Sequence, residues 1–349
     1  MRSLSHRIAV LVIICGSSLT TAVQADVFNM GPGLTSLELV TVGNPGNPGE
    51  LSGVPNGRPR VTGAAPYTYQ MGKYEVTAAQ YTEFLNAVAA DDVFSLYDEN
   101  MWNHPQGCKI ERLGSPGSYS YRVASDRANR PVNAVSPSDA MRFANWLTNG
   151  QPGGLKSTSV TDSGSYDFTN ANAPFQSSAM IRDPGAIFVV PNEDEWYKAA
   201  YHKNDGPTVN YYDYPMSSDA FPGNSLDPAQ SNNANILLSQ YAIGSPYWWT
   251  EVGTFASSPS PYGTFDQGGN IYEYTEDEFP GTNTVVVRGG SALGLVRELR
   301  ADQRIGAGHT NDVGWGFRVA MVPEPTTVWL FLVGGLVLMR RRPRVTAYD

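Results

Sequence analysis

The residues with the clearest chemical potential lie in one glycine-rich stretch, residues 262–274, Tyr-Gly-Thr-Phe-Asp-Gln-Gly-Gly-Asn-Ile-Tyr-Glu-Tyr. Gly268 and Gly269 let the backbone turn sharply, because glycine adopts conformations that are closed to other residues. Asp266 and Glu273 place one carboxylate on each side of this turn. Carboxylate and carbonyl oxygens are the ligands that calcium prefers. A calcium site is therefore one interpretation, and a sharp surface loop with solvated acids is the other.

The composition restricts the class of protein. The chain has 349 residues, of which 16% are charged, and it is rich in Gly, Pro and Tyr (35, 25 and 19 residues). Such a composition is typical of a loop-rich globular domain rather than a helical bundle. The net charge of −9 argues against binding to the phosphate backbone of a nucleic acid.

The amino terminus has the pattern of a secretory signal peptide. Arg2 and Arg7 precede an apolar run from Ile8 to Cys15, and small and polar residues follow as far as Ala25. This order predicts export, with cleavage by signal peptidase after Ala25. The first domain boundary is therefore placed at residues 1–25.

The carboxyl terminus, residues 322–349, carries a second processing pattern. Pro323-Glu324-Pro325 precedes an apolar run at 328–339 and the arginines 340–342. The run is short for a free-standing membrane helix, which needs about 20 apolar residues. The three parts together resemble the PEP-CTERM sorting signal of exported bacterial proteins, and an ordinary tail anchor is the alternative. The resemblance implies transient anchoring in the cell envelope, cleavage by an exosortase, and release to the cell surface or matrix.

Between these signals the pattern alternates short helices and strands with long loops. Three helices have recognisable amino-terminal caps, at Thr77, Ser136 and Asn192. Strands are predicted at 40–42, 67–72, 186–190, 248–255, 271–274, 285–288 and 314–320. Residues 204–247 are polar and rich in Pro and Tyr, and they indicate a long loop. Cys108 is the one cysteine outside the signal peptide, so it has no partner for an internal disulfide, and a buried, inert thiol is expected.

The order of several short motifs resembles the formylglycine-generating-enzyme, or sulfatase-modifying-factor, domain family. The stretches that carry this resemblance are Tyr-Glu-Val-Thr at 74–77, Arg-Pro-Val at 130–132, Pro-Asn-Glu-Asp-Glu-Trp at 191–196, the glycine turn at 262–274, Arg-Gly-Gly-Ser at 288–291 and Gly-Phe-Arg at 316–318. The resemblance covers roughly residues 36–321. It implies one domain at 26–321 with an α+β, C-type-lectin-like fold that is loop-rich and has few short helices and strands.

The resemblance also locates the expected active cleft. Active enzymes of this family bind copper with two cysteine thiolates that follow the Gly-Gly-Ser motif, and these positions fall at Gly294 and Leu299. Copper(I) favours thiolate ligands, so no copper and no formylglycine-generating activity are expected. Ser291 occupies a family active-site position. Arg297 and His309 lie in the polar stretch that follows, and with Ser291 they are the candidate residues of a ligand cleft.

The resemblance assigns calcium ligands as well. In the family one structural calcium is held by a side chain, two backbone carbonyls and a carboxylate, and the matching positions are Asp266, Gly269, Ile271 and Glu273. A second calcium site would begin at Asn235 and Ile236. Its distant carboxylate is missing, because Gly244 and Ser245 stand at that position.

Three functions are compatible with these observations. The first is an exported, non-catalytic binding or structural module that retains the family fold without the copper-binding cysteines. The second is a metal-dependent oxidoreductase of the non-haem iron or copper type in the same cleft. The third is a surface lectin for exopolysaccharide, for which aromatic residues at 211–249 would provide stacking surfaces. The expected partners besides the processing enzymes are exopolysaccharide or surface proteins.

Overall fold

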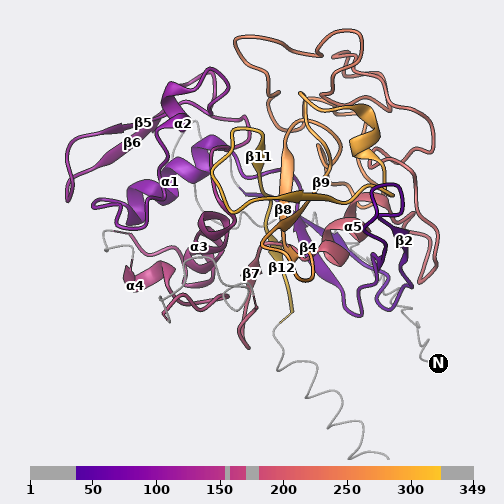
Figure 1. The fold of residues 1–349 in the computed structure, drawn as a ribbon, viewed down its shortest axis with the longest axis horizontal. Helices are drawn as coiled ribbons and strands as arrows, with labels where there is room; N and C mark the ends of the chain where they lie inside the picture. Colours follow the sequence, from indigo (N-terminus) through magenta and orange to yellow (C-terminus); the bar gives the residue numbers. More distant parts are fainter. Residues whose placement is uncertain (1–36, 154–157, 170–180, 324–349) are drawn as a thin grey trace, which may run out of the picture.

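The computed structural model describes residues 37–153, 158–169 and 181–323. The predicted signal peptide and the sorting signal beyond residue 323 lie outside these described residues. Within them, no helix is long and apolar enough to cross a membrane. Figure 1 shows α1, α2, α3 and α4 on one side of the central strands, with α5 and strand β2 on the other side.

A four-stranded sheet with the order β1-β4-β12-β7 joins the beginning of the domain to its end. Every neighbouring pair in this sheet is antiparallel. Its strands are β1 (Leu39–Val42), β4 (Tyr69–Gly72), β12 (Ala320–Met321) and β7 (Phe188–Val189). The predicted strands at 40–42, 67–72 and 186–190 are thereby confirmed, the last of them shortened.

A second four-stranded sheet, with the order β10-β9-β8-β11, carries the glycine turn and the Gly-Gly-Ser motif. Strands β8, β9 and β10 are antiparallel neighbours, whereas β11 runs parallel to β8. The strands are β8 (Tyr272–Glu278), β9 (Val285–Arg288), β10 (Ile305–Ala307) and β11 (Trp315–Gly316). The glycine turn therefore enters β8, and the Gly-Gly-Ser motif leaves β9 beside it.

The three capped helices form as the sequence predicts. Thr77, Ser136 and Asn192 each accept a hydrogen bond from a backbone N–H in the first turn, and each forms a complete capping box. The helices are α1 (Ala78–Val88), α3 (Pro137–Thr148) and α5 (Glu193–Tyr201). The remaining elements are α2 (Asn100–Asn103), α4 (Thr158–Thr161), the 3-10 turn η2 (Val296–Leu299), the hairpin of β2 (Glu50–Ser52) and β3 (Arg60–Thr62), and the hairpin of β5 (Ile110–Leu113) and β6 (Ser120–Val123).

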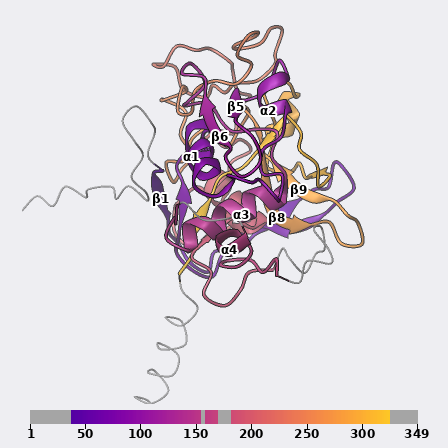
Figure 2. The same ribbon diagram turned by 90° about the vertical axis from the view of Figure 1, so that its left-hand side faces the viewer.

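An aromatic cluster joins α1, α3 and the closing segment of the domain. The Phe143 ring lies 5.3 Å from the Phe84 ring and 5.5 Å from the Phe317 ring, both edge to face. Tyr81 and Trp146 complete the contacts, and all five residues are at most 2% exposed. Offset and edge-to-face ring pairs add about 0.5–1.5 kcal/mol each beyond the burial of their surface. Figure 2 shows α1 and α3 from the side on which they cover the strands.

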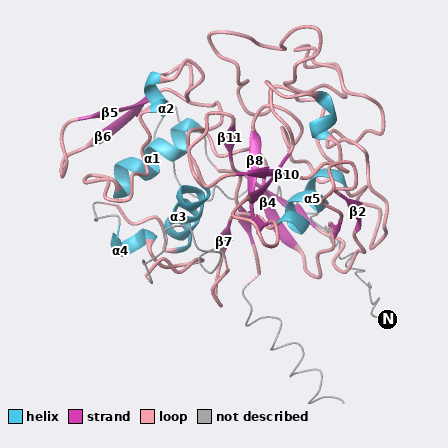
Figure 3. Cartoon of the chain, in the orientation of Figure 1, coloured by secondary structure: helices cyan, strands magenta, loops and turns pink. Residues whose placement is uncertain are grey.

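Two predicted strands differ in the structure. Residues 248–255 form no strand, because Trp249 is instead a buried anchor whose Nε1 donates to the Gln106 carbonyl. The segment 314–320 divides into β11 and β12, which belong to different sheets. Residues 204–247 form a long irregular loop, as predicted (Figure 3). Isolated bridges such as Gly223 with Asn233 fix this loop to itself and to its neighbours.

Candidate functional site

The glycine turn has the backbone geometry that its sequence requires. Gly269 has a φ of +83°, and a Cβ at this position would lie 2.5 Å from the Asn235 carbonyl oxygen. Only glycine fits such a close approach at a positive φ. Asp266 also has a positive φ, 61°, and its Oδ2 accepts a 2.6 Å hydrogen bond from the Gly253 N–H. The turn is thus fixed by its own glycine and by one buried carboxylate.

Glu273, on the other side of the turn, is already held by a cation. Arg318 donates from Nε to Oε2 at 2.5 Å and from Nη2 to Oε1 at 2.6 Å, and the Trp196 Nε1 donates to Oε2 at 2.7 Å. The side chains of Glu273 and Arg318 are both fully buried. A charge-assisted, two-point contact of this kind is among the strongest in proteins. Arg318 therefore supplies the positive charge that the sequence analysis expected from calcium at Glu273.

Two further carboxylates lie close to this pair. Glu75 is 1% exposed, its Oε1 accepts from the Asn270 side chain at 3.0 Å, and its Oε2 has no hydrogen-bond partner within the described part of the chain. Burial raises the pKa of Glu75, and it raises the pKa of Asp266 to about 6. The three buried carboxylates of Glu75, Asp266 and Glu273 therefore share the one guanidinium of Arg318. Protons or a cation must balance the negative charge that Arg318 leaves uncompensated.

The predicted calcium ligands fit this arrangement only in part. Asp266 and the carbonyls of Gly269 and Ile271 remain candidate oxygen donors, whereas Glu273 is committed to Arg318. The second set fits less well: the Asn235 carbonyl accepts from the Asn270 N–H, and the Ile236 carbonyl accepts from the Asn224 side chain. Both sets stay predictions. Among the described residues, no three His, Cys, Asp or Glu side chains are grouped to hold a metal ion.

The cleft positions of the two family cysteines are filled by other groups. A Cβ at Gly294 would lie 2.1 Å from Oε2 of Glu298 and 3.3 Å from the Tyr272 hydroxyl oxygen. Tyr272 donates a 2.5 Å hydrogen bond to the same Glu298 oxygen. Leu299 is fully buried in an apolar cluster with Tyr214, Met216, Ala234, Ile236 and Val296. A carboxylate and an apolar core thus occupy the region where active relatives carry thiolates.

The three candidate cleft residues do not converge. Ser291 is 3% exposed, and its Oγ accepts from the Leu293 N–H at 3.3 Å. Arg297 is exposed on η2. His309 lies beyond the other end of β9, because β10 runs antiparallel to it, and its Nε2 is 3.2 Å from Oε1 of Glu278. The structure therefore does not bring His309 to Ser291.

Cys108 is buried, as predicted, and is 2% exposed. Its N–H donates to the Asn133 side chain at 2.8 Å. Burial raises the pKa of the thiol to about 11, which lowers the fraction of reactive thiolate at neutral pH.

A buried ion-pair network at the start of α5 was missed by the sequence analysis. Both Glu193 oxygens accept from Arg304, at 2.7 and 2.6 Å, and Arg288 and Arg60 also donate to this carboxylate. The arginine charges and hydrogen bonds outweigh burial and lower the pKa of Glu193 to about 2. Arg288 could have indicated this network from the sequence, because it places a cation at the end of an otherwise apolar strand, directly before the Gly-Gly-Ser motif.

The comparisons with known proteins agree with the fold. The model of the "Sulfatase-modifying factor enzyme 1-like domain" matches residues 41–322. No curated protein matches the chain. Among solved structures, CarF is 20% identical with a TM-score of 0.50 and covers 82% of this chain and 98% of its own. Treponema denticola variable protein 1 is 17% identical with a TM-score of 0.48, and the match covers 83% of this chain and 96% of that protein. PvdO from Pseudomonas aeruginosa is 15% identical with a TM-score of 0.44, and the match covers 85% of this chain and 97% of that protein. At 20% identity the likeness to CarF shows the fold alone.

Proposed function

The chain belongs to the sulfatase-modifying factor enzyme 1-like domain family, and from this premise we propose that it is a non-catalytic binding module. One observation carries the proposal: Gly294 and Leu299 stand at the cysteine positions, and Glu298 and an apolar cluster fill the space around them. Copper(I) favours thiolate ligands. The remaining thiol, Cys108, is single and buried elsewhere. The module therefore has no thiolate pair with which to oxidise a substrate cysteine.

The alternative of a non-haem metal oxidoreductase has less support. Such a site needs several imidazole and carboxylate ligands around one ion. In the described part of the chain, no three residues of these types are grouped to share one. His309 contacts Glu278 beyond the end of β9 that lies away from Ser291. These positions favour binding over catalysis.

The alternative of a lectin that stacks sugars on aromatic rings of the 211–249 loop has mixed support. Phe221 and Tyr241 are exposed, with 65% and 38% of their surfaces accessible. Tyr211, Tyr214 and Trp249 are buried and serve packing. Trp248 is half-buried, and its ring lies 5.2 Å from the Tyr241 ring. The loop thus offers Phe221 and the Tyr241–Trp248 pair as candidate stacking surfaces.

The proposal includes export and surface display. It rests on the two terminal patterns, which predict cleavage by signal peptidase after Ala25 and by an exosortase at the Pro-Glu-Pro motif. The acidic balance of the chain is compatible with a surface location in contact with divalent cations. Surface proteins or exopolysaccharide are the proposed partners.

A peptide assay tests the non-catalytic role. The purified protein, supplied with copper and oxygen, is incubated with a peptide that carries a sulfatase cysteine motif, and an active family enzyme serves as positive control. We expect the peptide to keep its cysteine while the control converts it to formylglycine. Mass-spectrometric detection of the aldehyde with this protein would refute the proposal.

A further inference from the structure

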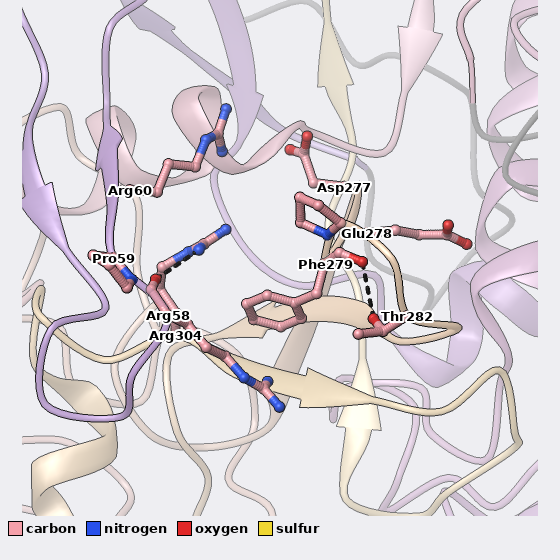
Figure 4. A pocket seen from close by; sticks show the side chains of 9 residues that line it. Arg58, Pro59, Arg60, Asp277, Glu278, Phe279, Thr282 and Arg304 are labelled. Carbon is pink, nitrogen blue, oxygen red and sulfur yellow. Dashed lines mark hydrogen bonds between the residues drawn. The ribbon is translucent and has the colours of Figure 1, made fainter.

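A cavity lined by arginines and acids lies away from the family cleft. It has a volume of about 560 Å³, within the range of small-molecule sites, and it opens between the β2–β3 hairpin and the end of β8. Figure 4 shows its side chains: Arg58, Pro59, Arg60, Asp277, Glu278, Phe279, Thr282 and Arg304. Ser291 follows the opposite end of β9, so this cavity and the cleft are separate places on the molecule.

Phe279 organises the floor of the cavity. The ring is 5% exposed, and the guanidinium carbons of Arg58 and Arg304 lie 4.1 and 4.8 Å from its centroid. A cation held against an aromatic ring keeps a defined orientation and gains about 0.5–1 kcal/mol at an exposed site. Arg58 is thus positioned by packing although its side chain is exposed.

The charges of the cavity differ in how they are compensated. Arg60 pairs with Glu193 and Asp194, and Arg304 pairs with Glu193. No carboxylate within the described residues lies at ion-pair distance from Arg58. Among the arginines of the cavity, Arg58 is therefore the one whose guanidinium N–H groups are available to a ligand. Two parallel N–H groups of a guanidinium match the two oxygens of a carboxylate.

The opposite wall presents one carboxylate to Arg58, that of Asp277 (Figure 4). One oxygen of Asp277 accepts a 2.5 Å hydrogen bond from the Glu193 N–H, and the neighbouring Glu278 is directed to His309, 3.2 Å away. The remaining lone pairs of Asp277 can accept from neutral hydroxyl groups. A compact polyanion such as phosphate would be repelled by this wall, and a neutral sugar would leave Arg58 without a partner.

We propose that this cavity binds a hexuronate, a sugar that carries one carboxylate and several hydroxyl groups. The carboxylate meets the Arg58 guanidinium in a two-point contact, and hydroxyls donate to Asp277 on the opposite wall. This inference rests on the proposed binding function and assigns its ligand class, such as the uronate units of an acidic polysaccharide. The site lies between β2–β3 and the β8 end rather than in the cleft beside Ser291.

The test measures binding of D-glucuronate to the purified protein by saturation-transfer NMR and titration calorimetry. D-glucose and glycine are the neutral and zwitterionic comparisons. Arg58→Ala should weaken glucuronate binding about 10- to 100-fold, as expected for the loss of a charge-assisted contact. Arg58→Lys, which keeps the charge without the fork, should give an intermediate loss. Arg122→Ala removes an exposed arginine on β6, outside the cavity lining, and should leave binding unchanged.

Arg58 is exposed and has no ion pair among the described residues, so its variants should fold, and an unchanged melting temperature checks this. The inference is overturned if Arg58→Ala binds like the wild type, or if Arg122→Ala abolishes binding. Glucose binding as tightly as glucuronate, glycine binding more tightly, or no binding of any probe would each overturn it too. None of these results bears on the missing thiolates, which the peptide assay tests separately.

Discussion

Replacing Glu193 with Gln should destabilise the domain strongly at neutral pH. The carboxylate is fully buried and holds Arg60, Arg288 and Arg304, which join the β2–β3 hairpin to β9 and to the segment before β10. Its pKa is lowered from 4.5 to about 2, a shift that corresponds to about 3 kcal/mol of folding free energy. Leaving buried arginines without their partner can raise the cost to about 5 kcal/mol. That is a large part of the 5–15 kcal/mol typical of a domain.

The pH dependence has a definite sign. Because the pKa of Glu193 is lower in the folded state, its stabilisation is fully present above pH 4.5 and is lost as the pH falls through about 2. Urea unfolding of wild type and Glu193→Gln should therefore differ by about 3 kcal/mol or more at pH 7 and by about half of that at pH 3. Glu111→Gln, which breaks the exposed pair with Arg122, is the matched control and should cost less than about 1 kcal/mol. A Glu193→Gln variant as stable as this control at pH 7, or a difference independent of pH, would refute the reasoning.

Three further predictions follow from separate features of the molecule. Burial raises the pKa of Asp139, the N3 residue of α3, from 3.8 to about 7. The folded state therefore favours the protonated carboxyl, and the stability that this gives at low pH is lost as the pH rises to about 7. The wild type should thus lose about 2 to 3 kcal/mol between pH 5 and pH 8, and Asp139→Asn should remove most of that loss in urea titrations. Calcium should raise the melting temperature through Asp266 and the adjoining carbonyls, and Asp266→Ala should abolish the rise; no effect of chelation on a wild type that contains no calcium would count against the site. Protein from the native host should begin near Asp26 and end near Pro325 by intact-mass measurement, and a retained full-length carboxyl terminus would contradict the sorting interpretation.

Local signals predicted much of the fold because they act within a few residues. The caps at Thr77, Ser136 and Asn192 specify where the helices begin, and the structure forms all three capping boxes. The apolar run at 285–288 likewise predicted strand β9, and the polar, Pro-rich composition of 204–247 predicted the irregular loop. The prediction of a strand at 248–255 was wrong because Trp249 in this segment is buried as an anchor and the segment pairs with no strand in the described part of the chain.

The candidate site was less predictable because its partners are far apart in the sequence. Glu273 meets Arg318 across 45 positions, and Glu193 meets Arg304 across 111. No periodicity in the sequence reports such pairs, so calcium was the expected partner of Glu273, and no partner was predicted for Glu193. The family resemblance located Gly294 and Leu299, yet only the structure shows that Glu298 occupies the space beside Gly294. No sequence pattern predicted the cavity at Arg58, because its lining comes from three separate segments of the chain.

Metal analysis of the purified protein tests the central claim, a cleft without redox metal, most directly. The protein is loaded with copper(I) or iron(II) under anaerobic conditions, dialysed against a weak chelator, and analysed by mass spectrometry of its elements beside an active family enzyme. With Gly294 and Leu299 at the thiolate positions, we predict only traces of either metal, while the enzyme retains copper. One equivalent of copper or iron that remains with this protein would contradict the account.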